Sequence, residues 1–352
     1  MIYPEFIKKG DIIGFCAPSD GDADEIGGAK LDSAAEQMIR RGYRVIETSL
    51  TRCSEKGKSG DGQGRGADFM SLIENPEVKS VFSVSGGDWL FEMLPFVDFQ
   101  KVRENPKWFE GMSDPTGLVH TITTLADVAS VYCANAGEFG MQPWDESLVN
   151  NFRILEGEDL IQKSCSRFQS GWLDYETGRE TYAFDSDVSV KRLDSDGSVT
   201  VSGRLLGGCM DVLVGLCGTR FDRTAAFAEK YAEDGILWYL EVFSMSPELI
   251  AFYLWKFKEA GWFKNAKGFL FGRPCMINDA YSAVSYEEGI MSVLSDLNVP
   301  VITGLDIGHR PPHWTVINGS VGEFAFTAGE THGENEHEAH GTGTAQLKQF
   351  LR

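Results

Sequence analysis

Short apolar runs alternate with segments of helical periodicity through residues 1–134 of this chain of 352 residues, and this alternation limits the folds open to it. Buried strands are predicted at Ile12–Cys16, Tyr43–Ile46, Val78–Val84, Trp108–Met112 and Val128–Ala134. Helices are predicted between them at Leu31–Arg41, Asp68–Ile73 and Thr116–Ala126. The fold class is therefore α/β, with a parallel sheet and crossover helices, and ligands of such sheets lie at the carboxyl ends of the strands.

The second half of the chain follows a different pattern. Residues 157–203 are polar and have turn residues at Asp194–Gly197, which predicts a connector with a hairpin that enters a second domain. Further strands are predicted at Ile236–Glu241, Gly268–Phe271 and Val299–Thr303, and helices at Pro247–Ala260 and Tyr286–Leu297. We expect an N-terminal domain over 1–156, a connector over 157–202 and a C-terminal domain over 203–352. The segment Glu330–Gly343, rich in Gly, Glu and His, is expected to be mobile.

Charge and composition exclude several classes of partner. The net charge of −20 argues against nucleic acid and against an anionic membrane surface, since both require basic patches. No apolar run reaches the roughly 18 residues that span a bilayer, and Met1–Asp11 lacks the apolar core of a secretory signal, so we expect a cytoplasmic protein. The 7 cysteines include no C-x-x-C pair and are interpreted as buried free thiols.

A serine lies where a predicted strand meets a predicted helix. In the stretch Glu110–Thr116, Gly111 precedes Ser113 by two residues and Asp114 follows it directly. A serine on such a turn has its hydroxyl directed outward and the next backbone N–H free to bind an anion. The stretch only half matches the Gly-x-Ser-x-Gly elbow of hydrolases, so a helix-capping residue is the alternative to a nucleophile.

Two glycine-containing segments could bind a ligand. Gly86–Gly87 follows the strand Val78–Val84 and could complete an oxyanion hole with Ser113, or could form a tight turn that binds nothing. Gly57-Lys58-Ser59 has the letters of a phosphate-binding loop. However, Arg52 stands where that loop requires its first glycine, so a solvated connection is the preferred interpretation.

A serine nucleophile needs a base and an orienting carboxylate. His309 follows a predicted strand with Gly308 beside it, whereas His313 is a weaker rival and His120 is interpreted as a packing residue. His332, His337 and His340 lie in the polar tail and are interpreted as solvated rather than as metal ligands. Glu241 closes an apolar strand, where a carboxylate needs a partner; an imidazole is one candidate, and Lys79 or Arg204 is the structural alternative.

Taken together, these segments resemble the LD-carboxypeptidase family of serine peptidases, which includes the microcin C immunity peptidases, over nearly the whole chain. The residues that carry the resemblance are Gly10–Gly14, Ala17–Ser19, Arg65, Ala67–Asp68, Gly86–Gly87, Leu94–Asp98, Gly111–Thr116, Gly203–Gly208, Leu240–Glu241, Gly272–Arg273, Pro300–Gly304 and Gly308–His309. The segment Gly111–Thr116 is similar to the family's G-x-S-D-x-T nucleophile motif.

The resemblance implies a function and a set of site residues. It implies a serine carboxypeptidase or amidohydrolase with the triad Ser113, Glu241 and His309, and an oxyanion hole from the backbone of Asp114 and of Gly86 or Gly87. The implied substrate is a small murein LD-peptide or a peptide–nucleotide. The resemblance also implies a Rossmann-like N-terminal domain and a smaller, β-rich, barrel-like C-terminal domain, with the site at their junction. Family members are commonly dimers and need no metal, so we expect a homodimer without a cofactor.

Several residues depart from the family's pattern near the expected substrate. Glu92 stands where arginine is common, Asp88-Trp89 replaces an aromatic–glycine pair, and Cys209 replaces asparagine. Asp88 and Glu92 are therefore candidate substrate-binding residues, and Trp172 of the connector is a candidate cover for the substrate.

Two other functions remain open. These departures favour a non-catalytic binding protein on the same fold. Independently of them, Gly86–Gly87 could belong to a nucleotide-binding α/β module.

Overall fold

The computed structural model describes residues 1–329 and 342–351. The segment predicted to be mobile, with its three histidines, lies outside these ranges except for Thr342 and Gly343, which begin a strand. Within the described ranges, no helix combines the length and the apolar character that crossing a bilayer requires.

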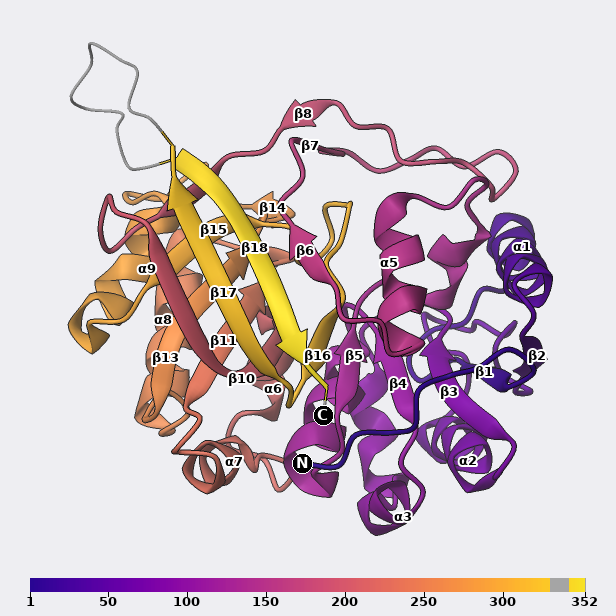
Figure 1. The fold of residues 1–352 in the computed structure, drawn as a ribbon. Coiled ribbons are helices and arrows are strands. Elements are labelled where there is room, and N and C mark those ends of the chain that lie inside the picture. Colours follow the sequence, from indigo (N-terminus) through magenta and orange to yellow (C-terminus); the bar gives the residue numbers. More distant parts are fainter. Residues whose placement is uncertain (330–341, 352) are drawn as a thin grey trace.

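The first half of the chain forms a parallel sheet, as the alternating pattern predicts (Figure 1). Its strands are β1 (Ile12–Cys16), β2 (Arg44–Glu47), β3 (Val78–Ser83), β4 (Trp108–Gly111) and β5 (Ser130–Tyr132), with β16 (Val316–Asn318) added at one edge. The order is β16-β5-β4-β3-β1-β2, and only β16 runs antiparallel. The order β2-β1-β3-β4-β5 is that of flavodoxin-like sheets, whose ligands bind where the strand order reverses, between β1 and β3.

Helices cover both faces of this sheet. The helices α1 (Glu25–Arg40) and α5 (Glu146–Leu155) pack on one face, and α2 (Gly62–Glu74), α3 (Phe99–Glu104) and α4 (Thr116–Thr121) pack on the other. Both α1 and α2 begin earlier than their apolar periodicity predicts, because Asp24 and Asp61 cap them by accepting hydrogen bonds from backbone N–H groups. The predicted helix over Thr116–Ala126 is α4 followed by a π-helical turn, η3 (Ile122–Ala126).

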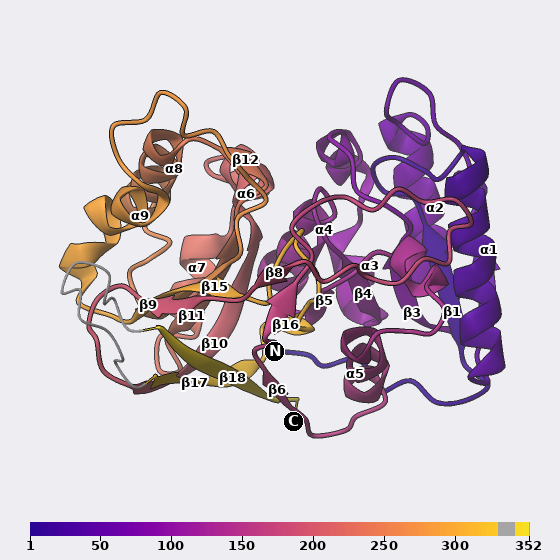
Figure 2. The ribbon, with the colours of Figure 1, turned by 90° about the horizontal axis from the view of Figure 1, so that it is seen from above.

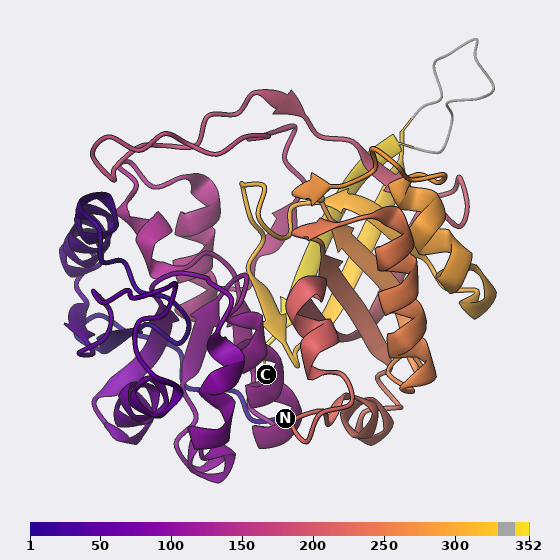
Figure 3. The ribbon, with the colours of Figure 1, turned by 180° about the vertical axis from the view of Figure 1, so that it is seen from behind.

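The second half closes into a β-barrel. The ring runs β17-β10-β11-β13-β15-β9-β18 and returns to β17, and β6 pairs with β18 outside it. The ring strands are β9 (Val190–Arg192), β10 (Val199–Cys209), β11 (Ile236–Glu241), β13 (Ala266–Gly272), β15 (Val301–Leu305), β17 (Val321–Ala328) and β18 (Thr342–Phe350). The helices α6 (Met210–Leu216), α7 (Thr224–Lys230), α8 (Pro247–Glu259) and α9 (Tyr286–Leu294) lie toward the side seen in Figure 3, opposite β17 and β18.

The connector crosses above both halves of the molecule (Figures 1 and 2). It contains β6 (Ile161–Lys163), β7 (Arg167–Phe168), β8 (Ser186–Asp187) and β9. The predicted hairpin around Asp194–Gly197 is wrong: the chain turns there, but β9 pairs with β15 and β18, whereas β10 pairs with β11 and β17. The sheets also cross the predicted domain limits, because β16 joins the N-terminal sheet and β9 joins the barrel.

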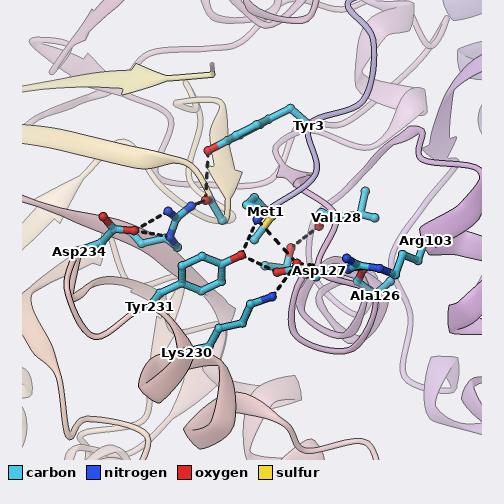
Figure 4. Close-up of polar contacts among 12 residues, drawn as sticks. Met1, Tyr3, Arg103, Ala126, Asp127, Val128, Lys230, Tyr231 and Asp234 are labelled. Atoms are coloured by element: carbon cyan, nitrogen blue, oxygen red, sulfur yellow. Dashed lines mark hydrogen bonds and ion pairs between the residues drawn. The ribbon is translucent and has the colours of Figure 1, made fainter.

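Helix α4 lies between the two halves (Figure 2), and one apolar core runs from its residues Leu118 and Val119 into the barrel at Leu205 and Leu206. A polar cluster ties the same seam together at its lower side (Figure 4). Asp127 accepts hydrogen bonds from Lys230 Nζ at 2.7 Å and from Tyr231 Oη at 2.6 Å.

Burial works to raise the pKa of Asp127, but its hydrogen bonds outweigh burial and bring the pKa to about 2. This carboxylate therefore stays charged at neutral pH and helps to fix how the two halves face each other.

Candidate active site

Ser113 stands directly beyond β4, on the turn that leads into α4. Its φ of 70° lies in the left-handed region, which a residue with a side chain adopts only when its surroundings force it. The side chain of Asn135 holds the preceding residue, since it accepts a hydrogen bond from Met112 N at 3.1 Å and donates one to Met112 O at 3.2 Å. This strained strand–turn–helix is the local geometry of a nucleophile elbow.

The strain makes a testable prediction about stability. Ser113→Gly is expected to unfold with a free energy about 1 kcal/mol greater than Ser113→Ala, because glycine adopts a positive φ without a steric cost. Both variants lack the hydroxyl, so the comparison isolates the backbone. Urea denaturation measures the difference, and a Ser113→Gly protein less stable than Ser113→Ala would show that the turn is unstrained.

Gly86 and Gly87 lie against this turn. A Cβ placed on Gly86 would stand 3.1 Å from Ser113 Oγ, so the loop after β3 passes directly beside the hydroxyl. Gly87 has φ 140°, and a Cβ there would overlap with Ser19 Oγ. In the described part of the chain, the backbone N–H groups of Gly86, Gly87 and Asp114 donate to no protein acceptor, and Gly87 and Asp114 line the cavity described below.

The side chain of Asp114 braces the neighbouring loops. Its carboxylate accepts hydrogen bonds from Ser19 Oγ and, at 2.8 Å, from Leu90 N. Burial raises its pKa, although these two hydrogen bonds work in the opposite direction. Asp114 thus joins the loops after β1, β3 and β4 at the carboxyl edge of the sheet.

Glu241 and His309 form a buried pair in the C-terminal half. Glu241 ends β11 and accepts a hydrogen bond from His309 Nδ1 at 3.0 Å and one from Tyr132 Oη at 2.8 Å. Burial raises the pKa of Glu241, but the charge of His309 and these hydrogen bonds outweigh it and lower the pKa overall. Burial lowers the pKa of His309, and Glu241 more than offsets this, so the imidazole has a raised pKa.

The alternative partners of Glu241 are engaged elsewhere. Lys79 pairs with Glu5 at 3.2 Å, and Arg204 pairs with Asp234. The imidazole is therefore the partner that the structure gives to this carboxylate.

A cavity of about 580 Å³ opens at the seam and brings the two sides together. Ser113 and Asp114 line it from the sheet, and Cys209, Asp211 and Phe243 line it from the barrel. The Phe243 ring also packs on His309, with 4.6 Å between ring centroids. Ser113 therefore lines the cavity, and His309 packs on Phe243 of its barrel-side wall; no direct hydrogen bond joins Ser113 and His309 in the described contacts.

The three candidate substrate-binding residues occupy different places. Asp88 lines the cavity. Trp172 is 63% exposed and is absent from the lining, but its ring lies 6.3 Å from that of Phe243, which does line the cavity. Glu92 is absent from the lining: it binds Arg65 at 2.8 Å and Lys58 at 2.6 Å. Its negative charge is thus balanced inside the protein.

The remaining candidates have structural contacts. His120 is a buried packing residue, as the sequence predicts: it stacks on Trp262 and burial lowers its pKa to about 4. His313 hydrogen-bonds to Glu138 at 3.2 Å. In the segment Gly57-Lys58-Ser59, Lys58 pairs with Glu92, and the buried Ser59 donates a hydrogen bond to the carbonyl of Ala17. Among residues 1–329 and 342–351, no group of His, Cys, Asp or Glu is placed to hold a metal ion.

The cysteines are free, as predicted, but the prediction that all of them are buried is wrong. Cys53 is exposed and Cys165 is half-buried, whereas the other five are buried.

Sequence reasoning missed three residues that build the site. Tyr132, Asn135 and Phe243 contact Glu241, the backbone before Ser113 and His309, respectively. Tyr132 lies in an apolar run and resembles any core tyrosine. Ser19 follows a predicted strand end, as Gly86–Gly87 and Ser113 do, and it donates a hydrogen bond to Asp114.

Comparison with known proteins agrees with this architecture. Residues 13–133 match the LD-carboxypeptidase N-terminal domain, and residues 202–324 match the LD-carboxypeptidase C-terminal domain. A putative carboxypeptidase of Vibrio cholerae is 25% identical over 93% of this chain and 96% of its own length. The microcin C7 self-immunity protein MccF of Escherichia coli is 26% identical over 88% of this chain and 89% of its own length.

Solved structures share the fold. MccF in complex with adenosine monophosphate aligns with a TM-score of 0.77 at 22% identity, over 92% of this chain and 95% of that one. The muramoyltetrapeptide carboxypeptidase of Oxalobacter formigenes aligns with a TM-score of 0.70 at 20% identity, over 96% and 98%. With two matching domains in the expected order, this chain belongs to the LD-carboxypeptidase family.

Proposed function

We propose that this protein is a serine peptidase that cleaves a peptide-like amide through an acyl-enzyme. The observation that carries the proposal is the buried Glu241–His309 pair, whose imidazole packs on Phe243 in the wall of the cavity that the strained, partly accessible Ser113 also lines. Membership of a family of carboxypeptidases supports the same reaction class. A free cavity beside a nucleophile, a base and its orienting carboxylate is the arrangement that acyl transfer requires.

Each residue has a role in the proposed reaction. His309 accepts the proton of Ser113 as the hydroxyl oxygen attacks the amide carbonyl, and Glu241 holds the imidazole tautomer and stabilises the imidazolium. The N–H groups of Asp114 and of Gly86 or Gly87 bind the oxyanion. His309 then protonates the leaving amine, and water releases the acyl group from Ser113. The hydrogen bond between Ser113 and His309 is expected to tighten when substrate fills the cavity.

The relatives suggest two substrate classes. Structures of MccF contain aspartyl sulfamoyl adenosine and glutamyl sulfamoyl guanosine, and another relative is a probable murein peptide carboxypeptidase of Bacillus subtilis. We propose a murein LD-peptide or a microcin C-type peptide–nucleotide as substrate. Incubation of the purified protein with an LD-tetrapeptide and with aminoacyl-nucleotide amides tests this, and release of the amine from neither class would contradict the proposal.

Two further expectations accompany this function. We propose that the protein works in the cytoplasm as a homodimer. Light scattering on the purified protein checks the oligomeric state, and a monomer at micromolar concentration would contradict the homodimer.

Alanine substitutions of Gly86 and Gly87 are expected to have different effects, one on the catalytic rate and the other on stability. Gly86→Ala is expected to lower kcat by about 10²-fold with the fold retained, because its new Cβ would crowd the Ser113 hydroxyl and misplace the attacking oxygen. Gly87→Ala is expected to lower the free energy of unfolding by about 1–3 kcal/mol, because its φ is positive and Ser19 fills the space.

Kinetics and thermal unfolding of both variants check this pair. If Gly86→Ala retains the wild-type kcat, the loop does not border the reacting atoms.

A further inference from the structure

His309 lies on a loop, residues 306–315, that leads from β15 of the barrel to β16 of the N-terminal sheet. The loop contains no helix or strand of its own, so contacts with other segments determine its conformation. It passes closely against Glu241: Gly308 has φ 94°, and a Cβ placed there would stand 2.7 Å from Glu241 Oε2. A small displacement of this loop would therefore disturb the hydrogen bond between Glu241 and the imidazole.

Arg273, which directly follows β13, binds this loop on both sides of the imidazole. Its guanidinium pairs with Asp306, which precedes His309 in the loop. It also donates hydrogen bonds to the carbonyl oxygens of Arg310, at 2.7 Å, and of Pro312, at 2.9 Å, which follow the imidazole. Arg273 is 4% exposed and Asp306 is 2% exposed, so these contacts are shielded from water. A guanidinium suits this place, because its planar fork holds several acceptors in fixed positions.

The connector binds the same loop. Asp306 accepts hydrogen bonds from Cys165 N at 2.9 Å and from the Cys165 thiol at 2.8 Å. Gln169 N donates to the carbonyl of Pro311 at 3.0 Å, so the three consecutive carbonyl oxygens after the imidazole all have donors. Arg273 and the connector together therefore occupy the polar groups on both sides of the imidazole.

We propose that Arg273 is a positioning residue, which holds His309 where its imidazole can bind Glu241 and reach the Ser113 hydroxyl. Arg273 is not among the described residues that line the cavity, so it acts through the loop rather than on the substrate. The inference rests on the proposed function, because it names a residue that keeps the proposed base in place. Misplacing a catalytic group by about 1 Å can cost on the order of 10²-fold in rate.

Arg273→Lys tests the proposal, because it keeps the positive charge and removes the fork. A lysine ammonium can pair with Asp306, but it cannot reproduce the fixed geometry in which the guanidinium also holds two carbonyl oxygens. We expect kcat to fall by about 10- to 100-fold, with KM within about twofold of the wild type because the cavity lining is unchanged. Steady-state kinetics on a cleavable amide measure both constants.

Arg204→Lys is the matched control. Arg204 lies in the same half of the molecule and is also largely buried, at 8% exposed. It pairs with Asp234 and donates to the carbonyl of Gly319, and none of its described contacts involves the loop of His309. We expect this variant to retain the wild-type kcat. Equal losses of kcat in the two lysine variants would overturn the inference, because both would then act only through stability.

Proton NMR follows the imidazole whether or not the protein cleaves the amides that are tried. The Nδ1 proton that His309 donates to Glu241 is expected to resonate downfield of the amide protons, and its absence in His309→Ala assigns it. Arg273→Lys is expected to move this resonance upfield or broaden it by faster exchange with water, and Arg204→Lys is expected to leave it unchanged. The same resonance in Arg273→Lys as in the wild type would contradict the positioning role.

A double variant covers the case in which Arg273→Lys does not fold. Arg273→Met combined with Asp306→Asn removes both charges, so that no buried ion is left without a partner. We expect the folded double variant to lose about 10²-fold in kcat, because the carbonyl oxygens beyond the imidazole no longer have their donor. A folded double variant with the wild-type kcat would overturn the inference.

These measurements distinguish the two proposals. If the wild-type protein cleaves none of the amides, and Arg273→Lys alone changes the resonance, the positioning role stands and the proposed function fails. If the wild-type protein cleaves an amide through Ser113, and Arg273→Lys matches Arg204→Lys in kcat and in the resonance, the positioning role is wrong and the proposed function stands.

Discussion

Ser113→Ala is expected to lower kcat by about 10⁶-fold with the fold intact, because the variant lacks the oxygen that forms the acyl-enzyme. The side chain borders the cavity and makes no hydrogen bond in the described structure, so its loss leaves no buried group unpaired. Single-turnover and steady-state kinetics on a cleavable amide measure the effect. The residual rate is expected to exceed the uncatalysed rate by about 10³-fold, because the oxyanion donors and substrate binding remain.

Ser71→Ala provides the matched control. Ser71 is exposed on α2, and its hydroxyl donates only to the carbonyl of Asp68. We expect this variant to retain the wild-type kcat and kcat/KM. A Ser113→Ala protein that turns over as fast as Ser71→Ala would mean that another group attacks the amide.

Glu241→Gln is expected to lower kcat by about 10⁴-fold, because an amide in place of the carboxylate no longer stabilises the imidazolium and can favour the wrong tautomer of His309. The variant also changes the pH profile. His309 acts as a base only when it is neutral, so activity rises as pH increases through its pKa, which Glu241 raises. Without this negative charge the pKa falls, and the rising limb of kcat/KM against pH is expected to move to lower pH.

Tyr132→Phe tests the effect of the position of the Glu241 carboxylate apart from the effect of its charge. Tyr132 donates to Glu241 Oε1, on the opposite side from His309, so its loss leaves the charge in place. We expect a smaller loss of kcat, about tenfold, with the rising limb within about half a pH unit of the wild type. A rising limb that stays fixed in Glu241→Gln would contradict the assignment of His309 as the base.

The sequence predicts buried strands well, because a short apolar run between helical segments is typical of a strand that a parallel sheet buries on both faces. The strands β1 and β11 match their predicted limits. Helix starts are missed where polar residues form the first turn: α1 begins at Glu25 and α2 at Gly62, beyond the reach of any apolar periodicity. Caps, rather than apolar faces, fix these starts.

The pairing of strands that are far apart in the sequence could not be predicted from local sequence patterns. Turn residues at Asp194–Gly197 indicate that the chain reverses, but not which strands then become neighbours. The short strand β16 joins the sheet of the other half, where its Val316 pairs with Tyr132. Nothing local distinguishes this strand from one that belongs to the barrel.

The residues of the candidate site also fall into two groups: those that the sequence indicates and those that it does not. Ser113, Glu241 and His309 carry chemical signals that are visible in the sequence, because a polar residue beside a buried strand end is costly unless it has a partner. Tyr132 and Phe243 carry none, since both resemble core residues until the two halves are brought together. Glu92 is a residue that the sequence wrongly indicates as part of the cavity. Its charge suggests that it binds a substrate, but in the structure its carboxylate binds Arg65 and Lys58.

The central claim is that the seam between the two halves makes the hydroxyl of one serine nucleophilic. A fluorophosphonate probe followed by peptide mass spectrometry tests it most directly, because such probes react with activated serines and spare ordinary ones. We predict a single phosphonylated residue, Ser113, and at least about 10²-fold slower labelling in Glu241→Gln and His309→Ala. Labelling at another residue, or labelling of Ser113 at an unchanged rate in both variants, would contradict the account.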